Sequence, residues 1–526
     1  MATPKHSHRP RGLGVTITLA LVLCAAAAEA ARSIPPNRGG RSPRVTGVGP
    51  ELLPYNPVAN EDTVVNSTDG RARFTILTDR LVRLEYSSSS SGGFEDRASL
   101  AFVNRNVAAP SFQVQQNQAV TEIVTDFLHL VYVEGGSASG FTPDNLSIEG
   151  KGSGKTSFAS KWKPGDANPG QLPGTIKSLD ALGVQTLNCT EVAMANLTVH
   201  DEQLHCNWAL FSRLGWTLFD DTTTPLIDPK DPDGWWQPEE KNADAQDWYF
   251  FGHGLDYLAA LRDYRNVGGV IPMLPKQIWG TWWTRWFNYN SHGIQHVVNS
   301  FREYSLPLDV LVYDMNWHIK DGSPDGWTGY TWDQRVLPNY LTLNKWLKSQ
   351  NLMLAANIHD AEGVGPNESR YRAACAAAGM NASANETVPF SVANKTLMLA
   401  VEDQVLNPLI TEDKLDFFWI DWQQGGTKGG ALGGRVNPTF WLNKVRSTDP
   451  KRVGSNERTL VLGRWGGLGN HRYQLGFSGD INDLQQNPIN WKSLAYQPYF
   501  SAQGGNVGYG FWSHDILTSG SDPELR

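Results

Sequence analysis

The chain has 526 residues, of which 45 are Lys or Arg and 53 are Asp or Glu, so its formal net charge at pH 7 is -8. This mild acidity, with no basic stretch, argues against a nucleic-acid partner. Hydrophobic residues make up 40% and charged residues 19% of the chain, which excludes disorder, collagen and coiled coil. The 20 Trp residues fit either a Trp-rich core or a site for flat, polar-edged ligands such as sugars.

The first 30 residues have the pattern of an export signal. Several basic side chains precede an apolar run from Leu13 to Ala28, and the small-residue site Ala28-Glu29-Ala30 follows. The run is shorter than the roughly 20 residues that span a bilayer, so an uncleaved anchor is the less favoured alternative. We therefore predict a signal peptide at 1–30, cleavage near Ala30, and a secreted or lysosome-like location with no membrane attachment afterwards.

Cysteines and glycosylation acceptors agree with that compartment. Cys24 would leave with the signal, and Cys189 and Cys206 are the predicted disulfide pair, which leaves Cys375 free. Asn-X-Ser/Thr acceptors are typical of surface loops in glycoproteins, and their cluster at 367–394 predicts an exposed, glycan-bearing insertion. The acceptors are Asn66, Asn145, Asn188, Asn196, Asn367, Asn381, Asn385 and Asn394.

The N-terminal half is predicted to be all-β. Residues 31–55, rich in Pro, Gly and Arg, are interpreted as a linker or a processed segment. Alternating runs at 74–77 and 81–86 predict a hairpin, and a further run covers 127–133. The spacing of these runs predicts a β-sandwich domain over 56–270.

From residue 271 to 526, apolar strands alternate with helical patterns, which is the order of a (β/α)8 TIM barrel. Ile294, Val297, Val298, Phe301 and Tyr304 share one face of a predicted helix, and further helices are expected near 341–349 and 489–503. Seven strands are one short of a closed barrel, so we expect the eighth strand to be missing from a truncated chain. The predicted strands are 277–283, 308–313, 352–358, 417–420, 460–463, 475–477 and 507–512.

Three aspartates stand at or just beyond the carboxyl ends of these strands. Asp314 and Asp421 directly follow apolar strands, and Asp480 follows Gly476-Phe477-Ser478-Gly479. In this fold the chemistry lies at that end, although each Asp alone could equally cap a helix or pair with Arg. A buried carboxylate is costly unless it is paired or functional. Together the three fit glycoside hydrolysis, in which two carboxyl groups flank the bond that is cleaved.

Ordered motifs around these aspartates sharpen the interpretation. Residues from about 245 to the end, and more weakly from about 70, resemble glycoside hydrolase family 31, the α-glucosidase and α-xylosidase family. The motifs that carry the resemblance are Tyr249-Phe250-Phe251-Gly252-His253-Gly254, Trp279-Gly280-Thr281-Trp282-Trp283, the strand ending at Asp314, Trp419-Ile420-Asp421-Trp422, Gly463-Arg464-Trp465-Gly466-Gly467, Phe477-Ser478-Gly479-Asp480 and Phe511-Trp512-Ser513-His514-Asp515-Ile516.

The resemblance implies a retaining double displacement on an α-glycosidic bond. Asp421 would be the nucleophile, kept ionised by a cation such as Arg464. Asp480 would be the general acid and then the base, its proton favoured by an apolar wall such as Phe477. Asp314 would bind sugar hydroxyls.

The remaining expected contacts surround those carboxylates. Arg464 and Asp515 match further substrate-binding positions, and Trp419 would form part of the wall, while Trp283, Trp422 and Trp512 are candidates for stacking on sugar. His471 is interpreted as an ordinary structural histidine. His359 and Asp360 could either line the cleft or cap a helix.

Two departures from the family pattern affect the substrate. Trp422-Gln423-Gln424 replace the usual Met-Asn-Glu after the nucleophile, and Phe477 replaces a Trp. They change walls and hydrogen bonds rather than the catalytic carboxylates, so α-glucose, α-xylose and α-galacto-type substrates all stay open. The family's histidine beyond the seventh strand, its eighth strand and its C-terminal β-domains have no counterpart in this chain.

The leading hypothesis is an exported α-glucosidase-like hydrolase acting on an oligosaccharide or glycoside, with no cofactor. The alternatives are a transglycosylase on the same scaffold, a catalytically silent carbohydrate-binding protein, and a structural glycoprotein, which would leave the three strand-end aspartates unexplained. No His-X-X-X-His signature indicates a metal, and Gly425-Gly426 and Gly429-Gly430 lack the spacing of a phosphate loop. The oligomeric state stays open.

Overall fold

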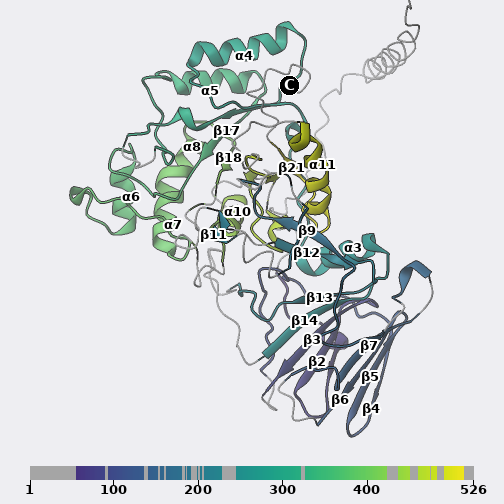
Figure 1. Ribbon diagram of the computed structural model, residues 1–526. Helices are drawn as coiled ribbons and strands as arrows, with labels where there is room; N and C mark the ends of the chain where they lie inside the picture. The colour runs from purple at the N-terminus through teal and green to yellow at the C-terminus, as the bar shows by residue number, and fades with distance from the viewer. Residues whose placement is uncertain are drawn as a thin grey trace, which may run out of the picture. The chain divides into compact units, whose positions relative to one another are not determined.

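The computed structural model describes residues 55–514, apart from gaps (Figure 1). The predicted signal peptide, nearly all of the predicted linker, Asn196 and Asp515 lie outside the described residues. The gaps are 89–92, 136–139, 152–153, 159–160, 181–183, 185, 191–197, 200–201, 204–205, 228–244, 322–325, 423, 425–429, 431–435, 450–459, 474 and 482–490.

Two five-stranded antiparallel sheets form the N-terminal half. The predicted hairpin is confirmed, with Phe74 paired opposite Leu84. Along β5 and β6 buried and partly exposed residues alternate, as expected for strands with one face on a core. The first sheet has the order β1 (Val64–Asn66), β2 (Ala72–Ile76), β3 (Leu81–Ser87), β14 (Ala245–Phe251) and β13 (Thr217–Asp220); the second has β4 (Phe112–Gln116), β5 (Val120–Thr125), β6 (Leu128–Val133), β7 (Leu146–Gly150) and β8 (Lys161–Trp162).

One apolar cluster joins side chains of the two sheets. Phe74 of β2 and Tyr132 of β6 contact each other with ring centroids 5.6 Å apart, and Trp162 of β8 lies 4.9 Å from Phe250 of β14. The sheets therefore bury their inner faces against each other, while the assignment of this half to a sandwich family stays a prediction.

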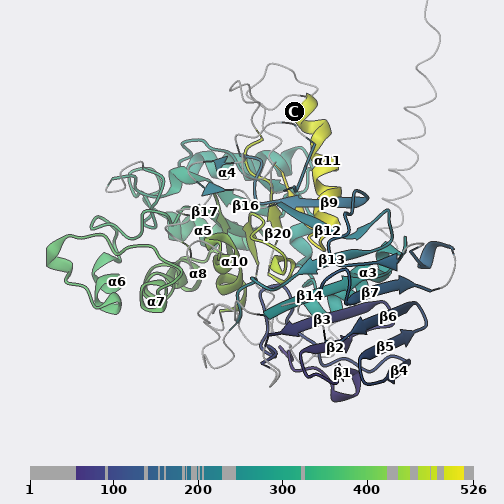
Figure 2. The same cartoon turned by 60° about the horizontal axis from the view of Figure 1, so that its bottom comes forward.

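Smaller elements connect these sheets to the C-terminal half. β9 (Gln171–Ile176) pairs with β12 (Cys206–Ser212), β10 (Thr198–Val199) pairs with β11 (Glu202–Gln203), and the helix α3 (Tyr257–Gly268) begins after the capping side chain of Asp256. Helix α11 contacts β9 (Figure 2). Short 3₁₀ turns cover Glu61–Thr63 and Gly154–Thr156.

The C-terminal half contains a curled, seven-stranded parallel sheet with its strands in chain order. Alternate residues of each strand enter different cores: Val310 and Val312 of β16 join an inner cluster with Phe417 and Trp419 of β18. The strands are β15 (Trp282–Trp283), β16 (Val310–Tyr313), β17 (Met353–Ile358), β18 (Phe417–Ile420), β19 (Val461–Gly463), β20 (Leu475–Phe477) and β21 (Trp512–Ser513).

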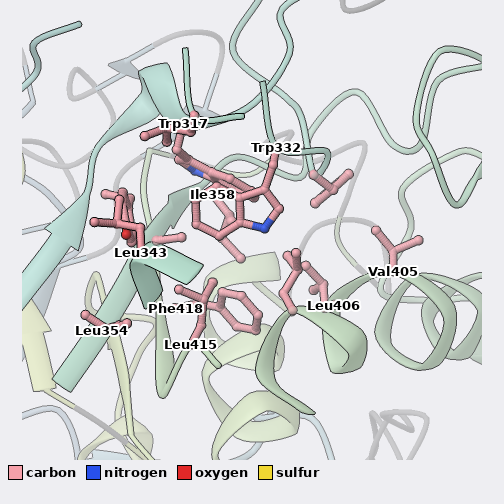
Figure 3. Packing of buried hydrophobic residues seen from close by; sticks show 14 of the residues in the cluster. Trp317, Trp332, Leu343, Leu354, Ile358, Val405, Leu406, Leu415 and Phe418 are labelled. Carbon is pink, nitrogen blue, oxygen red and sulfur yellow. The ribbon is translucent and has the colours of Figure 1, made fainter. Parts of the chain in front are cut away.

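Helices cover the outer face of this sheet. Other residues of β16, β17 and β18, such as Leu354 and Phe418, pack with helical side chains in a large outer cluster that includes Trp317 and Trp332 (Figure 3). The helices are α4 (Ser291–Glu303), α5 (Tyr340–Ser349), α6 (Tyr371–Ala378), α7 (Lys395–Val401), the π-helical turn Glu402–Leu406, α8 (Asn407–Thr411), α10 (Pro438–Thr448) and α11 (Trp491–Gly505), with 3₁₀ turns at Lys276–Trp279, Met315–Trp317, Ala382–Ala384 and Asn470–Arg472. In the described part of the chain, no helix has both the length and the apolar character to cross a membrane.

The outermost predicted strands are shorter than expected. Residues 276–279 form a 3₁₀ turn, so the first strand keeps only Trp282–Trp283. Just before that strand, the backbone N of Thr281 donates to Asp309 Oδ2 at 2.9 Å. The predicted strand at 507–512 begins as a turn through Gly508, whose φ of 77° is left-handed, and only Trp512–Ser513 pair. The expectation about an eighth strand stays a prediction.

Candidate active site

Asp421 lies buried at the carboxyl end of β18, and both of its carboxylate oxygens accept hydrogen bonds. Its Oδ1 accepts from Arg464 Nη1 at 2.6 Å and from the backbone N of Trp422 at 2.8 Å, and its Oδ2 accepts from Asn357 Nδ2 at 2.9 Å. Burial by itself raises the pKa of this carboxyl, but Arg464, His359 and these hydrogen bonds outweigh it, so the pKa lies below its ordinary value. Asp421 is therefore held ionised, as the sequence interpretation expected of a nucleophile.

Two residues at the carboxyl end of β17 face Asp421. The sequence does not identify Asn357, and it leaves open whether His359 lines the cleft or caps a helix. Asn357 in β17 donates from one nitrogen to both Asp421 and Asp314, the latter at 3.2 Å. His359 Nε2 lies 3.6 Å from Asp421 Oδ2, and burial lowers the pKa of this histidine. His359 thus lines the site, whereas Asp360 turns away and pairs with Arg446 at 2.8 Å.

Arg464 at the end of β19 joins the two halves of the molecule. Its guanidinium is fully buried and contacts Asp421, Asp180 at 2.8 Å, and Ser178 Oγ at 3.1 Å. Asp180 and Ser178 follow β9 and hydrogen-bond to each other. Sequence reasoning missed both, because their only signal is a short polar segment after a weak strand, 284 residues from Arg464.

The same loop positions the backbone of Asp480. Asp180 Oδ1 accepts from the backbone N of Asp480 at 2.7 Å, and the backbone N of Leu179 donates to the carbonyl of Ser478 at 2.8 Å. A side chain on Gly479, whose φ is 85°, would come within 2.4 Å of Asp180, so glycine permits this approach. Both predicted catalytic aspartates are therefore anchored to one arginine–aspartate pair.

Asp314 ends β16 beside Asp421 and Asp480. Burial raises its pKa to about 7, and the charges of the two neighbouring aspartates add to this, while hydrogen bonds from the backbone of Met315 at 2.8 Å and from Asn357 oppose it. Near neutral pH the Asp314 carboxyl is therefore partly ionised, when it only accepts hydrogen bonds, and partly protonated, when it can also donate one. A small, mostly apolar cavity of about 20 Å³ between β16 and α4 also has Asp314 on its wall.

The predicted aromatic residues divide into two groups. Trp419 meets Phe477 edge to face with centroids 4.9 Å apart, and Phe477 lies 5.0 Å from the Arg464 guanidinium, so both form the wall of the site. Trp283 borders the cavity beside Asp314. Trp512 is partly buried, packs against Phe500 and donates from Nε1 to the Tyr509 carbonyl at 2.8 Å, and its stacking on sugar stays a prediction.

Two residues that follow Asp421 have a strained backbone. Trp422 and Gln424 have φ values of 54° and 55°, which residues with side chains rarely adopt. Gln424 is buried, and its Oε1 accepts from the backbone N of Asp360 at 2.6 Å. The neutral amide of Gln424 therefore connects the chain after Asp421 to the neighbouring strand end without placing another negative charge near Asp421.

The other predicted positions have simpler surroundings. His471 is fully buried and contacts the carbonyl of Gly269 at 3.0 Å, and burial lowers its pKa to about 3, in agreement with a structural role. Cys189 and Cys206 form a disulfide, and Cys375 is buried and free. Among the described residues, no group of His, Cys, Asp and Glu is arranged to hold a metal ion.

Most of the described acceptor asparagines are exposed, but Asn145 is not. Asn145 is buried, and its Nδ2 donates to the carbonyl of Gly140 at 2.9 Å while its Oδ1 accepts from the backbone of Thr142. A glycan on this nitrogen would have to break that contact, so the prediction for Asn145 conflicts with the fold. The exposed acceptors are Asn66, Asn188, Asn367, Asn381, Asn385 and Asn394.

Comparisons with known proteins agree with this geometry. Residues 271–524 match the family model described as the glycosyl hydrolases family 31 TIM-barrel domain. An alpha-xylosidase of Saccharolobus solfataricus is 28% identical over 119 residues, which cover 21% of this chain and 16% of that protein. The match therefore spans about a sixth of that relative.

Solved structures show the same fold at low sequence identity. A family 31 alpha-xylosidase from a soil metagenome, complexed with xylose, has a TM-score of 0.57 at 15% identity, with 88% of this chain and 72% of that chain covered. The family 31 dextranase of Flavobacterium johnsoniae, complexed with glucose, has a TM-score of 0.58 at 16% identity, with 86% and 59% covered.

Proposed function

Because the chain belongs to glycoside hydrolase family 31, we propose that it is a retaining glycosidase that cleaves α-glycosidic bonds. Asp421 is the nucleophile and Asp480 is the general acid and base. The observation that carries the proposal is the surroundings of Asp421: a fully buried arginine and an amide keep a buried carboxylate ionised at the carboxyl end of a parallel strand.

The proposed reaction has two steps. In the first, a carboxylate oxygen of Asp421 forms a bond to the anomeric carbon while the glycosidic C–O bond breaks, and the leaving oxygen takes the proton of Asp480. In the second, Asp480 takes a proton from water, whose oxygen attacks the anomeric carbon and releases Asp421. The first step requires that Asp421 is ionised and that Asp480 carries a proton, and the second requires that Asp480 is ionised so that it can take the proton of water.

The groups around the two carboxylates would hold the sugar ring. Asp314, with a pKa of about 7, can both accept and donate a hydrogen bond near neutral pH, which suits a sugar hydroxyl. Trp419 and Phe477 supply an apolar wall against the ring face. Arg464 is fully buried and contacts Asp421 Oδ1. We therefore propose that it positions Asp421 and balances its charge, and that it does not bind the substrate.

The sugar at the cleaved end is proposed to be xylose or glucose, because the similar proteins include alpha-xylosidases and a dextranase. The predicted signal and the exposed acceptor asparagines support export and glycosylation of the chain. Both remain part of the proposal.

A panel of aryl α-glycosides tests the activity. Wild type should release nitrophenol from the α-xyloside or the α-glucoside, and Asp421→Ala should abolish the release, while the matched control Asp62→Ala, at an exposed position in the N-terminal half, should not. No turnover from folded wild type on any member of the panel would refute the proposed activity.

Separate variants test the two roles. A 5-fluoro α-glycosyl fluoride should label Asp421 covalently, and mass spectrometry of the digest should place the label there. Asp480→Ala should still release a burst of fluoride from glycosyl fluorides, whose leaving group needs no proton, although turnover slows because no base activates water; it should lose even the first step on alkyl glycosides. Labelling of another residue, or equal loss on both substrates, would contradict these roles.

A further inference from the structure

A row of aromatic rings leads away from Asp421 toward solvent. His359 lies 3.6 Å from the nucleophile, and the ring of Trp327 lies 5.5 Å from that of His359 and 6.5 Å from that of Trp422. Trp286 follows, 6.3 Å from Trp327 with the ring planes 37° apart. The rings are thus spaced regularly from the proposed reaction centre outward.

These rings come from four successive strand-to-helix connections. Trp286 follows β15, Trp327 lies between β16 and α5, His359 follows β17, and Trp422 follows β18. In this fold the connections at the carboxyl ends of the strands surround the substrate. The row therefore lies on the rim of the proposed active site, although no local sequence pattern links its members.

Exposure increases along the row. His359 is 5% exposed, Trp327 is 37% exposed and Trp286 is 61% exposed. An aromatic ring left in water gives up the free energy that its burial would yield, so exposed tryptophans beside a reaction centre indicate a ligand that covers them. A row that begins buried at the nucleophile and ends in solvent suits a chain-like ligand with one end in the site.

Polar groups accompany the rings. Trp286 Nε1 donates to Asn316 Oδ1 at 3.4 Å, and Asn316 lies two residues beyond Asp314. Asn316 and Arg285 line the same cavity wall as Asp314. Flat rings combined with amide and guanidinium groups match the alternating apolar faces and hydroxyl edges of sugars better than they match an aliphatic ligand.

We propose that Trp327 and Trp286 bind the leaving-group sugars of an α-linked oligosaccharide by stacking. The inference rests on the proposed glycosidase function and specifies its substrate: an oligosaccharide of at least three sugars, cleaved at the end that reaches Asp421. Trp327 holds the sugar next to the cleaved bond, and Trp286 holds the following one.

The test compares two substrates that carry the sugar released by the wild-type enzyme: its glycosyl fluoride and a trisaccharide that ends in it. The glycosyl fluoride has a one-atom leaving group and does not reach the rings, whereas the trisaccharide does. Because each stacked ring would hold its sugar in the transition state, Trp327→Ala and Trp286→Ala should each lower kcat/KM for the trisaccharide about 3- to 10-fold. Hydrolysis of the fluoride should stay within about twofold.

Control variants separate stacking from damage to the site. Trp327→Phe and Trp286→Phe keep a ring and should restore most of the trisaccharide activity. Trp279→Ala removes a tryptophan of similar exposure, 58%, that precedes β15 and packs against Phe511 at 4.9 Å, so it should affect neither substrate. Equal losses on both substrates, or none on the trisaccharide, would overturn the inference.

Failure of the proposed function gives a different result. If wild type hydrolyses nothing, binding of isomaltotriose and maltotriose is followed by calorimetry with the wild-type chain and the two alanine variants. Binding that weakens in both variants but not in Trp279→Ala would support the aromatic site without catalysis. No binding, or binding that is equal in all variants, would overturn it.

Discussion

Replacing Asp314 with asparagine should stabilise the fold at neutral and alkaline pH while it harms activity. The ordinary pKa of this carboxyl is 3.8, and in the folded chain it rises to about 7 through burial and through the charges of Asp421 and Asp480. Between these two pKa values the folded chain retains a proton that the unfolded chain has lost. The contribution of Asp314 therefore lowers the free energy of unfolding as the pH rises from about 4 to about 7. Above pH 7 this loss of stability stays constant.

The difference of about 3 pH units corresponds to about 4 kcal/mol, at about 1.4 kcal/mol per unit. The amide that Asp314→Asn introduces does not titrate, and its oxygen can still accept from the backbone of Met315. For a chain of this length the entropy of unfolding is about 1 kcal/mol per kelvin, so Asp314→Asn should melt about 4 °C above wild type at pH 8 and within about 1 °C of it at pH 4.

Differential scanning calorimetry at the two pH values measures this gap, with Asp62→Asn as the exposed control. A gap in melting temperature that is the same at pH 4 and pH 8, or a variant that is less stable at pH 8, would refute the reasoning. On the proposed function, the variant should also raise KM or lower kcat, because sites that bind substrate are often built at the expense of stability.

Three further substitutions test the charges and hydrogen bonds around Asp421. Arg464→Met leaves buried carboxylates without their cation, so it should destabilise the chain by about 3–5 kcal/mol, measured by thermal unfolding, and Arg464→Lys should not fully restore it. Asn357→Leu removes a donor that lowers the pKa of Asp421, so the acidic limb of the pH profile of kcat/KM should move to higher pH; an unchanged limb would contradict this. Arg446→Met breaks the buried pair with Asp360 and should cost about 3–5 kcal/mol in unfolding experiments, whereas Arg335→Met, which removes an exposed guanidinium that pairs with Asp321 and Asp333, should cost much less.

Local patterns in the sequence were sufficient for the elements that carry the site. The four-residue strand Phe417–Ile420 matches its prediction, and the helices at 291–303 and 340–349 appear where apolar spacing placed them. Alternation and helical spacing depend on neighbours a few residues apart, so they can be recognised without the fold. The same locality explains the error at 277–283, where a 3₁₀ turn at Lys276–Trp279 makes the strand begin only at Trp282.

The sequence by itself therefore determined where the strands end and that Asp314, Asp421 and Asp480 lie there, because side-chain periodicity and strand order are properties of short segments. Only the tertiary structure decided which charges neutralise one another. Asp180 reaches Arg464 from 284 residues away, and Asn357 of β17 joins the carboxylates at the ends of the two strands that flank it, β16 and β18. The rings of Trp286 and Trp327 likewise become neighbours only when the connections of adjacent strands meet at one edge of the sheet. Electrostatic and stacking interactions act over a few ångströms in space whatever the separation along the chain, so packing alone brings these partners together.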